Sequence, residues 1–155
     1  MISRLSAIFV ATTFLVGLSA CGESTANTTP TSIASAQSTV ITLSDMMITM
    51  GNTFKAGKYT FTITNTGKVA HELIGFRSAF AHDQYPLDAT GAVNEEDPSI
   101  TKVTDGDNLE PGTSQTREID LSQPGKYVFM CNLPASADLQ AHFAAGMYVD
   151  ITVTA

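Results

Sequence analysis

The residues of this chain best suited to carry chemistry are three soft donors near its C-terminal end. Cys131 closes an apolar, strand-like run, and His142 and Met147 follow before the chain re-enters an apolar run. A thiolate, an imidazole and a thioether delivered by one loop between two strands indicate a pocket for a soft metal ion. His71, within the apolar run VAHELIGF, is the candidate for a fourth ligand.

Each of these four residues also has an ordinary explanation. A single histidine in an apolar strand is more often hydrogen-bonded than ligating, and buried cysteine and methionine side chains are commonly packing. The four residues together indicate a metal site, because two neutral imidazoles, one thiolate and a weak axial thioether are the ligands of trigonal blue-copper sites. We therefore expect one copper ion bound by His71, Cys131, His142 and Met147.

Other sulfur and imidazole side chains are interpreted as structural. Met46, Met47 and Met50 lie in a strand-like run, and their spacing favours packing over a thioether site for cuprous ion. Met130 precedes Cys131 and is expected on the opposite face of its strand, because successive side chains alternate. His82 falls in a long polar stretch and is expected to be solvated.

The elements that must position the ligands are short strands separated by turns. The segment 59–65 alternates, with Tyr59, Phe61 and Ile63 on one face and threonines on the other. No segment has a convincing helical period over more than two turns. The pattern predicts an all-β fold, an antiparallel Greek-key sandwich or barrel. The strand-like runs are 38–50, 59–65, 69–77, 115–122, 126–131 and 146–155.

The bulk composition is that of one acidic domain. The chain has 155 residues, is 43% hydrophobic, and carries a formal net charge of −7 with a pI near 4.7. The length suits a single domain, and the acidity argues against nucleic acid or an anionic membrane surface as a partner. The two cysteines, Cys21 and Cys131, lie in such different contexts that a disulfide between them is the less favoured interpretation.

Residues 1–21 have the layout of an export signal. Arg4 precedes an apolar run that is short for a membrane span, and small residues follow. The last four residues, LSAC, resemble a bacterial lipobox, in which the cysteine, here Cys21, is lipidated and becomes the mature N-terminus. An ordinary secretory signal or an uncleaved anchor is the alternative. We expect an exported protein, lipid-anchored to the bacterial cell membrane on its periplasmic or extracellular face.

The segment that follows the signal is predicted to be a tether. Residues 22–38 are rich in Ser, Thr and Ala and hold almost no large apolar side chains, which is typical of a flexible linker. The folded domain is then expected to span 39–155. Cys131 would be its only thiol in an oxidising compartment, where a bound metal would protect it.

One stretch, 78–99, lacks strand periodicity and is predicted to be a long irregular excursion with a short helix around 78–84. A solvated loop is the ordinary interpretation of this region, and a docking face for a basic partner protein is the alternative. Between positions 78 and 110 the only basic residue is Lys102, whereas the acidic residues are Asp83, Asp88, Glu95, Glu96, Asp97, Asp105, Asp107 and Glu110.

Most of 39–155 resembles the cupredoxins, the family of small blue copper proteins that includes plastocyanin and azurin. NTGKVAHELIGF is similar to the strand that carries the family's first histidine ligand. EPGTSQTREIDLSQPGKYVFMCNLP, with HFAAGMYVDITV, is similar to the C-terminal strands and ligand loop. The resemblance implies that His71 and His142 are the imidazole ligands, Cys131 the thiolate and Met147 the axial thioether.

Two positions depart from the family pattern. Relatives with the same CNLP start commonly have the second histidine just after the proline, whereas residues 135–141 intervene here. The entropy of closing a loop grows slowly with its length, so metal binding should survive the insertion. Glu72 stands where relatives commonly have Asn. A carboxylate cannot donate the hydrogen bonds of an amide, which predicts a different arrangement around the ligands.

The resemblance implies a carrier of single electrons and no enzymatic activity. Electrons would pass through the edge of His142, with redox proteins docking there or, if basic, on the acidic region 78–110. The apolar surround of His142 would consist of Leu133, Pro134, Phe143, Ala144 and Ala145.

We further expect a monomer that contacts the membrane only through its lipid anchor and does not bind nucleic acid. The alternative function is a cell-surface copper carrier or buffer that delivers copper to a cuproenzyme.

Overall fold

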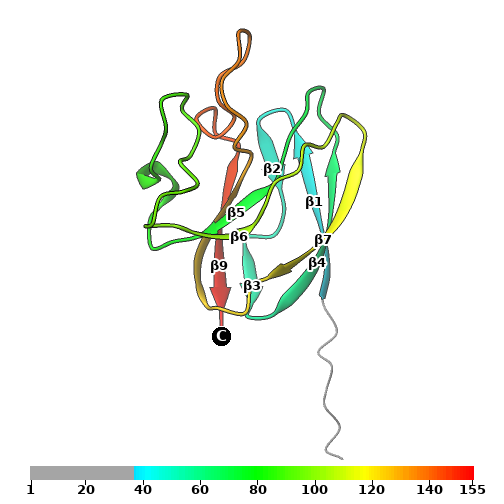
Figure 1. Ribbon diagram of the computed structural model, residues 1–155. Helices are drawn as coiled ribbons and strands as arrows, with labels where there is room; N and C mark the ends of the chain where they lie inside the picture. The colour runs from blue at the N-terminus through cyan, green and yellow to red at the C-terminus, as the bar shows by residue number, and fades with distance from the viewer. Residues whose placement is uncertain (1–36) are drawn as a thin grey trace, which may run out of the picture. The chain divides into compact units, whose positions relative to one another are not determined.

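Two β-sheets pack face to face in the computed structural model, which describes residues 37–155 (Figure 1). The only helical element in these residues is a single 3-10 turn, η1 (His82–Gln84), so the predicted all-β sandwich is confirmed. The four-stranded sheet has the order β2 (Met47–Thr49), β1 (Gln37–Ser44), β4 (Lys58–Asn65), β7 (Ser114–Asp120). The five-stranded sheet has the order β3 (Thr53–Lys55), β9 (Tyr148–Thr154), β8 (Gly125–Met130), β5 (Ile74–Arg77), β6 (Thr101–Thr104).

Strand pairing is mixed rather than purely antiparallel. β1 pairs with β4 and β3 pairs with β9 in parallel, whereas the other paired strands are antiparallel. After the β1–β2 hairpin the chain passes through β3 in the other sheet, and β4 then returns beside β1 in the same direction. Side-chain alternation determines which face a strand buries but not the direction of its neighbour, so the sequence pattern could not reveal these two pairs.

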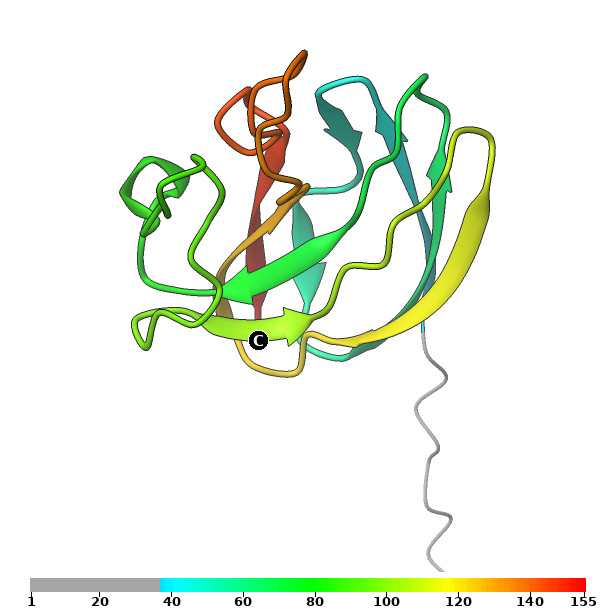
Figure 2. The same cartoon turned by 45° about the horizontal axis from the view of Figure 1, so that its top comes forward.

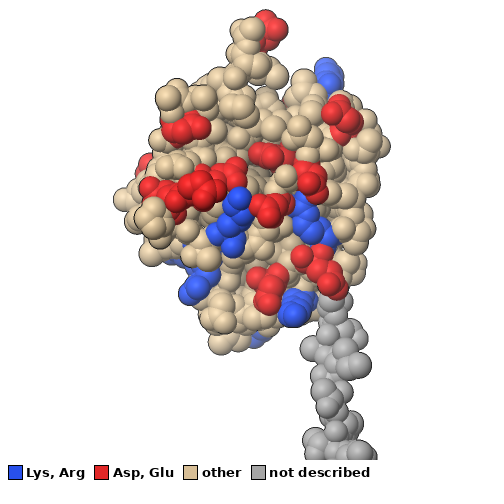
Figure 3. Space-filling view, in the orientation of Figure 1, with Lys and Arg blue, Asp and Glu red and all other residues tan. Residues whose placement is uncertain are grey.

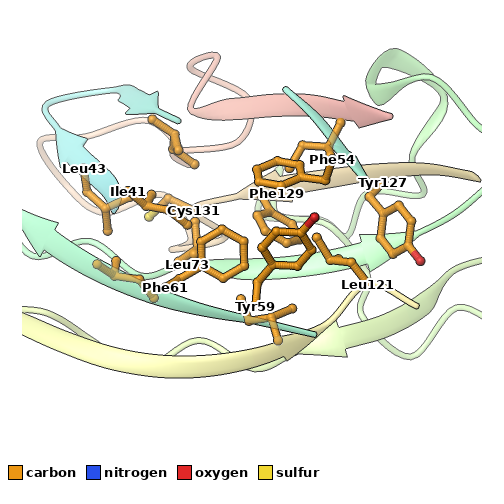
Figure 4. Close-up of a cluster of buried hydrophobic side chains, with 14 of the residues drawn as sticks. Ile41, Leu43, Phe54, Tyr59, Phe61, Leu73, Leu121, Tyr127, Phe129 and Cys131 are labelled. Atoms are coloured by element: carbon orange, nitrogen blue, oxygen red, sulfur yellow. The ribbon is translucent and has the colours of Figure 1, made fainter. Parts of the chain in front are cut away.

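The main core lies between the sheets and follows the alternation read from the sequence (Figure 4). Tyr59, Phe61 and Ile63 on β4 are all buried, and Phe129 on β8 packs against them from the other sheet. The rings of Phe61 and Phe129 meet edge to face, with centroids 6.2 Å apart. Cys131 belongs to the same cluster, so the core reaches the first predicted metal ligand.

The irregular excursion covers the outer face of the five-stranded sheet (Figures 1 and 2). Phe76, Val128 and Met130 point to this face and form a second hydrophobic cluster with Tyr85 and Val93 of the excursion. β5 and β8 are therefore buried on both faces over 74–76 and 127–130, which explains why these residues are continuously apolar. The prediction of an irregular stretch with a short helix is confirmed. The stretch is nevertheless a packed cover for the sheet rather than a simple solvated loop.

The expectations for the N-terminal region lie outside the described residues. These are the export signal 1–21, lipidation of Cys21 and most of the linker 22–38. The described chain starts with β1 at Gln37, two positions before the expected start of the domain. Among residues 37–155, no helix has the length and apolar character needed to cross a membrane.

Gly75 on β5 provides a test of how tightly the core packs around its cross-strand partner, Phe129 on β8. A Cβ at this position would lie 2.4 Å from Cε1 of Phe129, a fully buried residue, so the ring or the backbone would have to shift. Gly75→Ala should lower the free energy of unfolding by about 1–3 kcal/mol, the usual effect of overpacking a core. Urea denaturation of the metal-free protein measures this change.

The matched control is Gly57→Ala in the turn before β4, where the nearest atom to an added Cβ is 4.0 Å away. Its effect should stay within about 0.5 kcal/mol, as for most surface substitutions. Equal stabilities for the two variants would contradict the packing described for Gly75.

Candidate metal centre

Three of the four predicted ligands converge at one end of the sandwich. Nδ1 of His142 lies 3.2 Å from Sγ of Cys131 and 3.2 Å from Nδ1 of His71. Nδ1 of His71 lies 3.9 Å from the same sulfur atom. The three side chains are 0%, 0% and 3% exposed for His71, Cys131 and His142. Because the donor atoms all lie within 4.8 Å of one another, one ion can contact all three.

His71 is held by an isolated β-bridge rather than by a regular strand. Its backbone N–H donates to Leu109 O at 3.1 Å, and Leu109 N–H donates back to His71 O at 2.7 Å. Asn65, buried at the end of β4, donates from Nδ2 to the carbonyls of Leu109 and Val69 at 2.7 and 2.9 Å. The predicted strand 69–77 is therefore too long, because β5 begins only at Ile74.

Backbone hydrogen bonds also fix the other ligands in the loop between β8 and β9. Cys131 N–H donates to Met147 O at 3.0 Å, and Met147 N–H donates to His142 O at 2.9 Å. Met147 is 0% exposed and belongs to the same core cluster as Cys131. The loop thus places the predicted axial thioether residue beside the thiolate and one imidazole residue.

The inserted residues 135–141 do not disturb this arrangement. His142 N–H donates to Leu133 O at 3.0 Å, and this contact closes the base of the insertion. Beyond it the chain forms an exposed loop, tightened by a hydrogen bond from Ser136 N–H to Leu139 O at 2.8 Å. In Figure 1 this loop, drawn in orange, projects from the top of the molecule. The extra length is taken up outside the ligand cluster.

The surround of His142 differs in part from the prediction. Leu133 and Pro134 line a depression of about 270 Å³ together with His142, as expected, but Leu139 of the insertion lines it too. Phe143 instead packs into the second hydrophobic cluster, beneath the excursion. His142 therefore lies in the wall of an apolar depression rather than protruding from a flat surface.

Burial sets the protonation states of the metal-free ligands. It raises the pKa of the Cys131 thiol to about 11, although the backbone N–H of Glu72, 3.4 Å from Sγ, favours the thiolate. Burial lowers the pKa of both His71 and His142 below the ordinary histidine value. At neutral pH the two imidazoles are therefore uncharged and ready to ligate, whereas the thiol must lose a proton.

Glu72 connects the two ligand segments through an acceptor rather than a donor. Its Oε1 accepts a hydrogen bond from the backbone N–H of Asn132 at 3.0 Å. Its backbone N–H, one residue after His71, faces the sulfur of Cys131. The predicted difference from the family's amide thus takes the form of a carboxylate that binds a backbone N–H. Desolvation raises the pKa of this carboxyl group.

Asn132 is a supporting residue that sequence reasoning missed. Its Oδ1 accepts from Val93 N–H at 2.6 Å, and its Nδ2 donates to Val93 O at 3.0 Å and to Glu95 Oε1 at 2.9 Å. The side chain thereby pins the excursion to the ligand loop. Its position directly after Cys131 was the only available signal, and nothing in the sequence indicated its partner.

The other sulfur and imidazole candidates stay out of the site. Met47 is 56% exposed at the start of β2, and Met50 packs at the edge of the main core. Met130 faces the second cluster, which confirms the prediction of opposite faces. His82 is not simply solvated, because its Nδ1 lies 2.7 Å from Asp150 Oδ2 and its ring stacks on Tyr148.

The donor set restricts the choice of metal. Two imidazole nitrogens and one thiolate suit zinc and copper, whereas Mg²⁺ and Ca²⁺ require oxygen ligands. A buried methionine beside the thiolate favours copper, because zinc is bound by thiolate, imidazole and carboxylate rather than by thioether. The residues present therefore fit one copper ion.

The protonation states predict that metal binding releases one proton per ion at pH 7. The proton comes from the Cys131 thiol, since both imidazoles are already neutral, and apparent affinity should rise about tenfold per pH unit below the thiol pKa. Titration calorimetry with Zn²⁺, a redox-inert probe, in buffers of different ionisation enthalpy counts the protons. Cys131→Ser should abolish the release. A count of two would mean that a ligand histidine is charged before binding.

The fold, though not the sequence, matches known proteins. No protein-family profile matches the chain, and no curated protein matches it by sequence. A dithionite-reduced auracyanin from the photosynthetic bacterium Roseiflexus castenholzii is 24% identical, with a TM-score of 0.51 over 77% of this chain and 98% of that one. Auracyanin B is 18% identical, with a TM-score of 0.52 over 77% of this chain and 90% of that one.

A multicopper oxidase from the hyperthermophile Aquifex aeolicus is also similar. It is 18% identical, with a TM-score of 0.50, and the match covers 82% of this chain but only 31% of the oxidase. The shared part is thus a single domain that occurs both alone and within a larger enzyme. These likenesses, with the two-sheet topology, show that the chain has the cupredoxin fold.

Proposed function

We propose that this chain is a type 1, or blue, copper protein that transfers single electrons. One observation carries the proposal: Nδ1 of His71, Nδ1 of His142 and Sγ of Cys131 converge in a buried cluster, 3.2–3.9 Å apart. Met147 would supply the weak axial thioether. Such a ligand set suits cuprous and cupric ions alike, which limits rearrangement when an electron is exchanged.

The arrangement favours electron transfer over catalysis of its own. Four protein ligands would fill the coordination shell, whereas a catalytic metal site keeps a position open for substrate or water. His142 lines the apolar depression, so the edge of this ligand is the natural route for an electron to a docked protein. The likeness to one domain of an oxidase is compatible with this role, because it concerns the fold alone.

Copper delivery to a cuproenzyme is the second candidate, and the same depression supports it. A receiving thiol could approach the metal beside His142, between Leu133 and Leu139. The two roles differ in what leaves the protein. Repeated oxidation and reduction with retention of copper supports electron transfer, whereas rapid loss of copper to a thiol acceptor supports delivery.

The proposed setting is the outer surface of a bacterial cell membrane, with Cys21 lipidated. The signal-like residues 1–21 and the linker-like residues 22–38 support this location. The proposed partners are exported or membrane-bound redox proteins, and the protein would act as a monomer. The parent protein should be found in the membrane fraction of the cell. Loss of the protein from this fraction in a Cys21→Ala variant would support the lipid anchor.

Copper loading of the purified 22–155 chain tests the proposed site. Cupric ion should produce an intense visible band from thiolate-to-copper charge transfer, and Cys131→Ser should abolish it because serine supplies no thiolate. Met130→Leu is the matched control, since Met130 is buried next to Cys131 but faces the second cluster. No band in the parent chain, or a band that survives Cys131→Ser, would exclude blue copper.

The acidic region offers a docking surface for a basic redox partner. Figure 3 shows Asp and Glu side chains in a band across one face, with few cations among them. Glu95 and Asp105 are paired with Lys102, at 2.8 and 3.0 Å, whereas Glu96 is exposed and has no ion-pair partner among the described residues. The net field of this region is therefore negative.

Electron exchange with a cationic redox protein should consequently slow as salt concentration rises. Glu96→Lys should reduce the low-salt rate and flatten its salt dependence, because electrostatic steering raises association rates by about ten- to a thousandfold. Glu118→Lys, which makes the same charge change on β7 of the other sheet, is the control. Equal effects of the two variants would show that only net charge matters.

A further inference from the structure

His71 has a second ring nitrogen that the proposed copper site does not use. Its Nδ1 faces Cys131 and His142, so Nε2 points away from the ligand cluster. Nε2 is buried and forms no hydrogen bond within the described residues. A buried polar nitrogen without a partner is uncommon and calls for an explanation.

Asp45 is the group that faces this nitrogen. Its Oδ1 lies 3.6 Å from His71 Nε2, an ion-pair distance slightly longer than a hydrogen bond. The His71 side chain is fully buried, whereas the Asp45 side chain is 44% exposed. The carboxylate thus reaches in from the surface toward the back of a proposed metal ligand.

The position of Asp45 is fixed by the surrounding backbone. Asp45 lies in the turn between β1 and β2, and its Oδ1 accepts a hydrogen bond from Lys68 N–H at 2.7 Å. Thr66 N–H donates to Leu43 O at 2.7 Å, which ties the segment before His71 to the end of β1. Two separate loops are therefore joined where the carboxylate meets the ring.

Gly67 keeps the space between them open. A Cβ at this position would lie 2.5 Å from Asp45 Oδ1 and 2.9 Å from His71 Nε2. Any larger residue would push the carboxylate and the imidazole apart. The close approach thus depends on three residues from two segments, which makes a chance surface contact a poor explanation.

We propose that Asp45 is a positioning residue that accepts the Nε2–H of His71 in the copper-loaded protein and places a negative charge behind this ligand. The inference rests on the proposed function. When Nδ1 binds the metal, the proton of the neutral ring must sit on Nε2, where Asp45 Oδ1 is the facing acceptor. The contact would fix the tautomer and the ring orientation.

The charge has a redox consequence. A carboxylate near the metal stabilises the cupric ion more than the cuprous ion, because the cupric ion carries one more positive charge. Removing the charge should therefore favour the cuprous state. Partial exposure of Asp45 screens the effect, so a moderate change is expected.

The decisive variant is Asp45→Asn, which keeps the size of the side chain and an acceptor for Lys68 N–H. It should raise the ratio of cuprous to cupric affinity by about three- to tenfold; a tenfold change corresponds to about 59 mV in a one-electron midpoint potential. Potentiometric titration followed by the visible band gives this value.

Asp120→Asn is the matched control. Asp120 also accepts a backbone N–H locally, from Ser122 at 2.8 Å, and its removal changes the net charge equally. It pairs with Lys58 at the far end of the β4–β7 ladder, six positions from the end near His71, or roughly 20 Å along the strand. It should leave the midpoint potential nearly unchanged.

A second readout does not depend on redox behaviour. In the diamagnetic cuprous protein, long-range proton–nitrogen spectra report which nitrogen of His71 carries the proton and how fast this proton exchanges with water. The parent should show a slowly exchanging Nε2–H, and Asp45→Ala should accelerate its exchange at least tenfold. His142 Nε2–H serves as the internal reference and should not change.

The outcomes separate the two proposals. If the parent chain binds no copper through Cys131, the proposed function fails. If it binds copper normally but Asp45→Asn shifts the potential no more than Asp120→Asn, and Asp45→Ala leaves the exchange of His71 Nε2–H unchanged, the role of Asp45 is excluded. A shift in Asp45→Asn alone, with normal ligand binding, supports it.

Discussion

Two imidazoles and a thiol are buried together at one end of the sandwich. Polar groups buried in this way destabilise a fold unless they have hydrogen-bond partners or bind an ion. The neighbouring segments must therefore hold these side chains in fixed positions. The bridge between His71 and Leu109 and the bonds that link Cys131, Met147 and His142 hold the three donor atoms within 4.8 Å of one another. The positions of these donors are therefore determined by backbone hydrogen bonds of the fold.

Much of this site could be predicted from the sequence, for identifiable reasons. The four ligand types stood in a recognisable order, and the alternation of 59–65 specified the buried face of β4. Partners far apart in the sequence could not be predicted. The acceptor role of Glu72, the pairing of Asn132 with Val93 and the bridge that shortens β5 all depend on contacts across the fold. The parallel pairing of β1 with β4 was hidden for the same reason.

The excursion links the second hydrophobic cluster to the ligand loop. Tyr85 and Val93 cover β5 and β8. The side chain of Asn132 forms hydrogen bonds with both the N–H and the carbonyl of Val93. The segment that carries much of the negative charge is thus anchored one residue after the thiolate. An acidic surface held in this way has a defined position relative to the metal, which a freely moving loop would not provide.

The hydrogen bond between His142 N–H and Leu133 O divides the loop between β8 and β9 into two parts. Residues on one side of this bond place Cys131, His142 and Met147, and residues 135–140 beyond it form an exposed loop. Substitutions, or even changes of length, within 135–140 should therefore change the outer surface and leave the convergence of His71, Cys131 and His142 intact. The insertion thus gives the chain an exposed segment whose sequence and length are decoupled from the positions of the converging side chains.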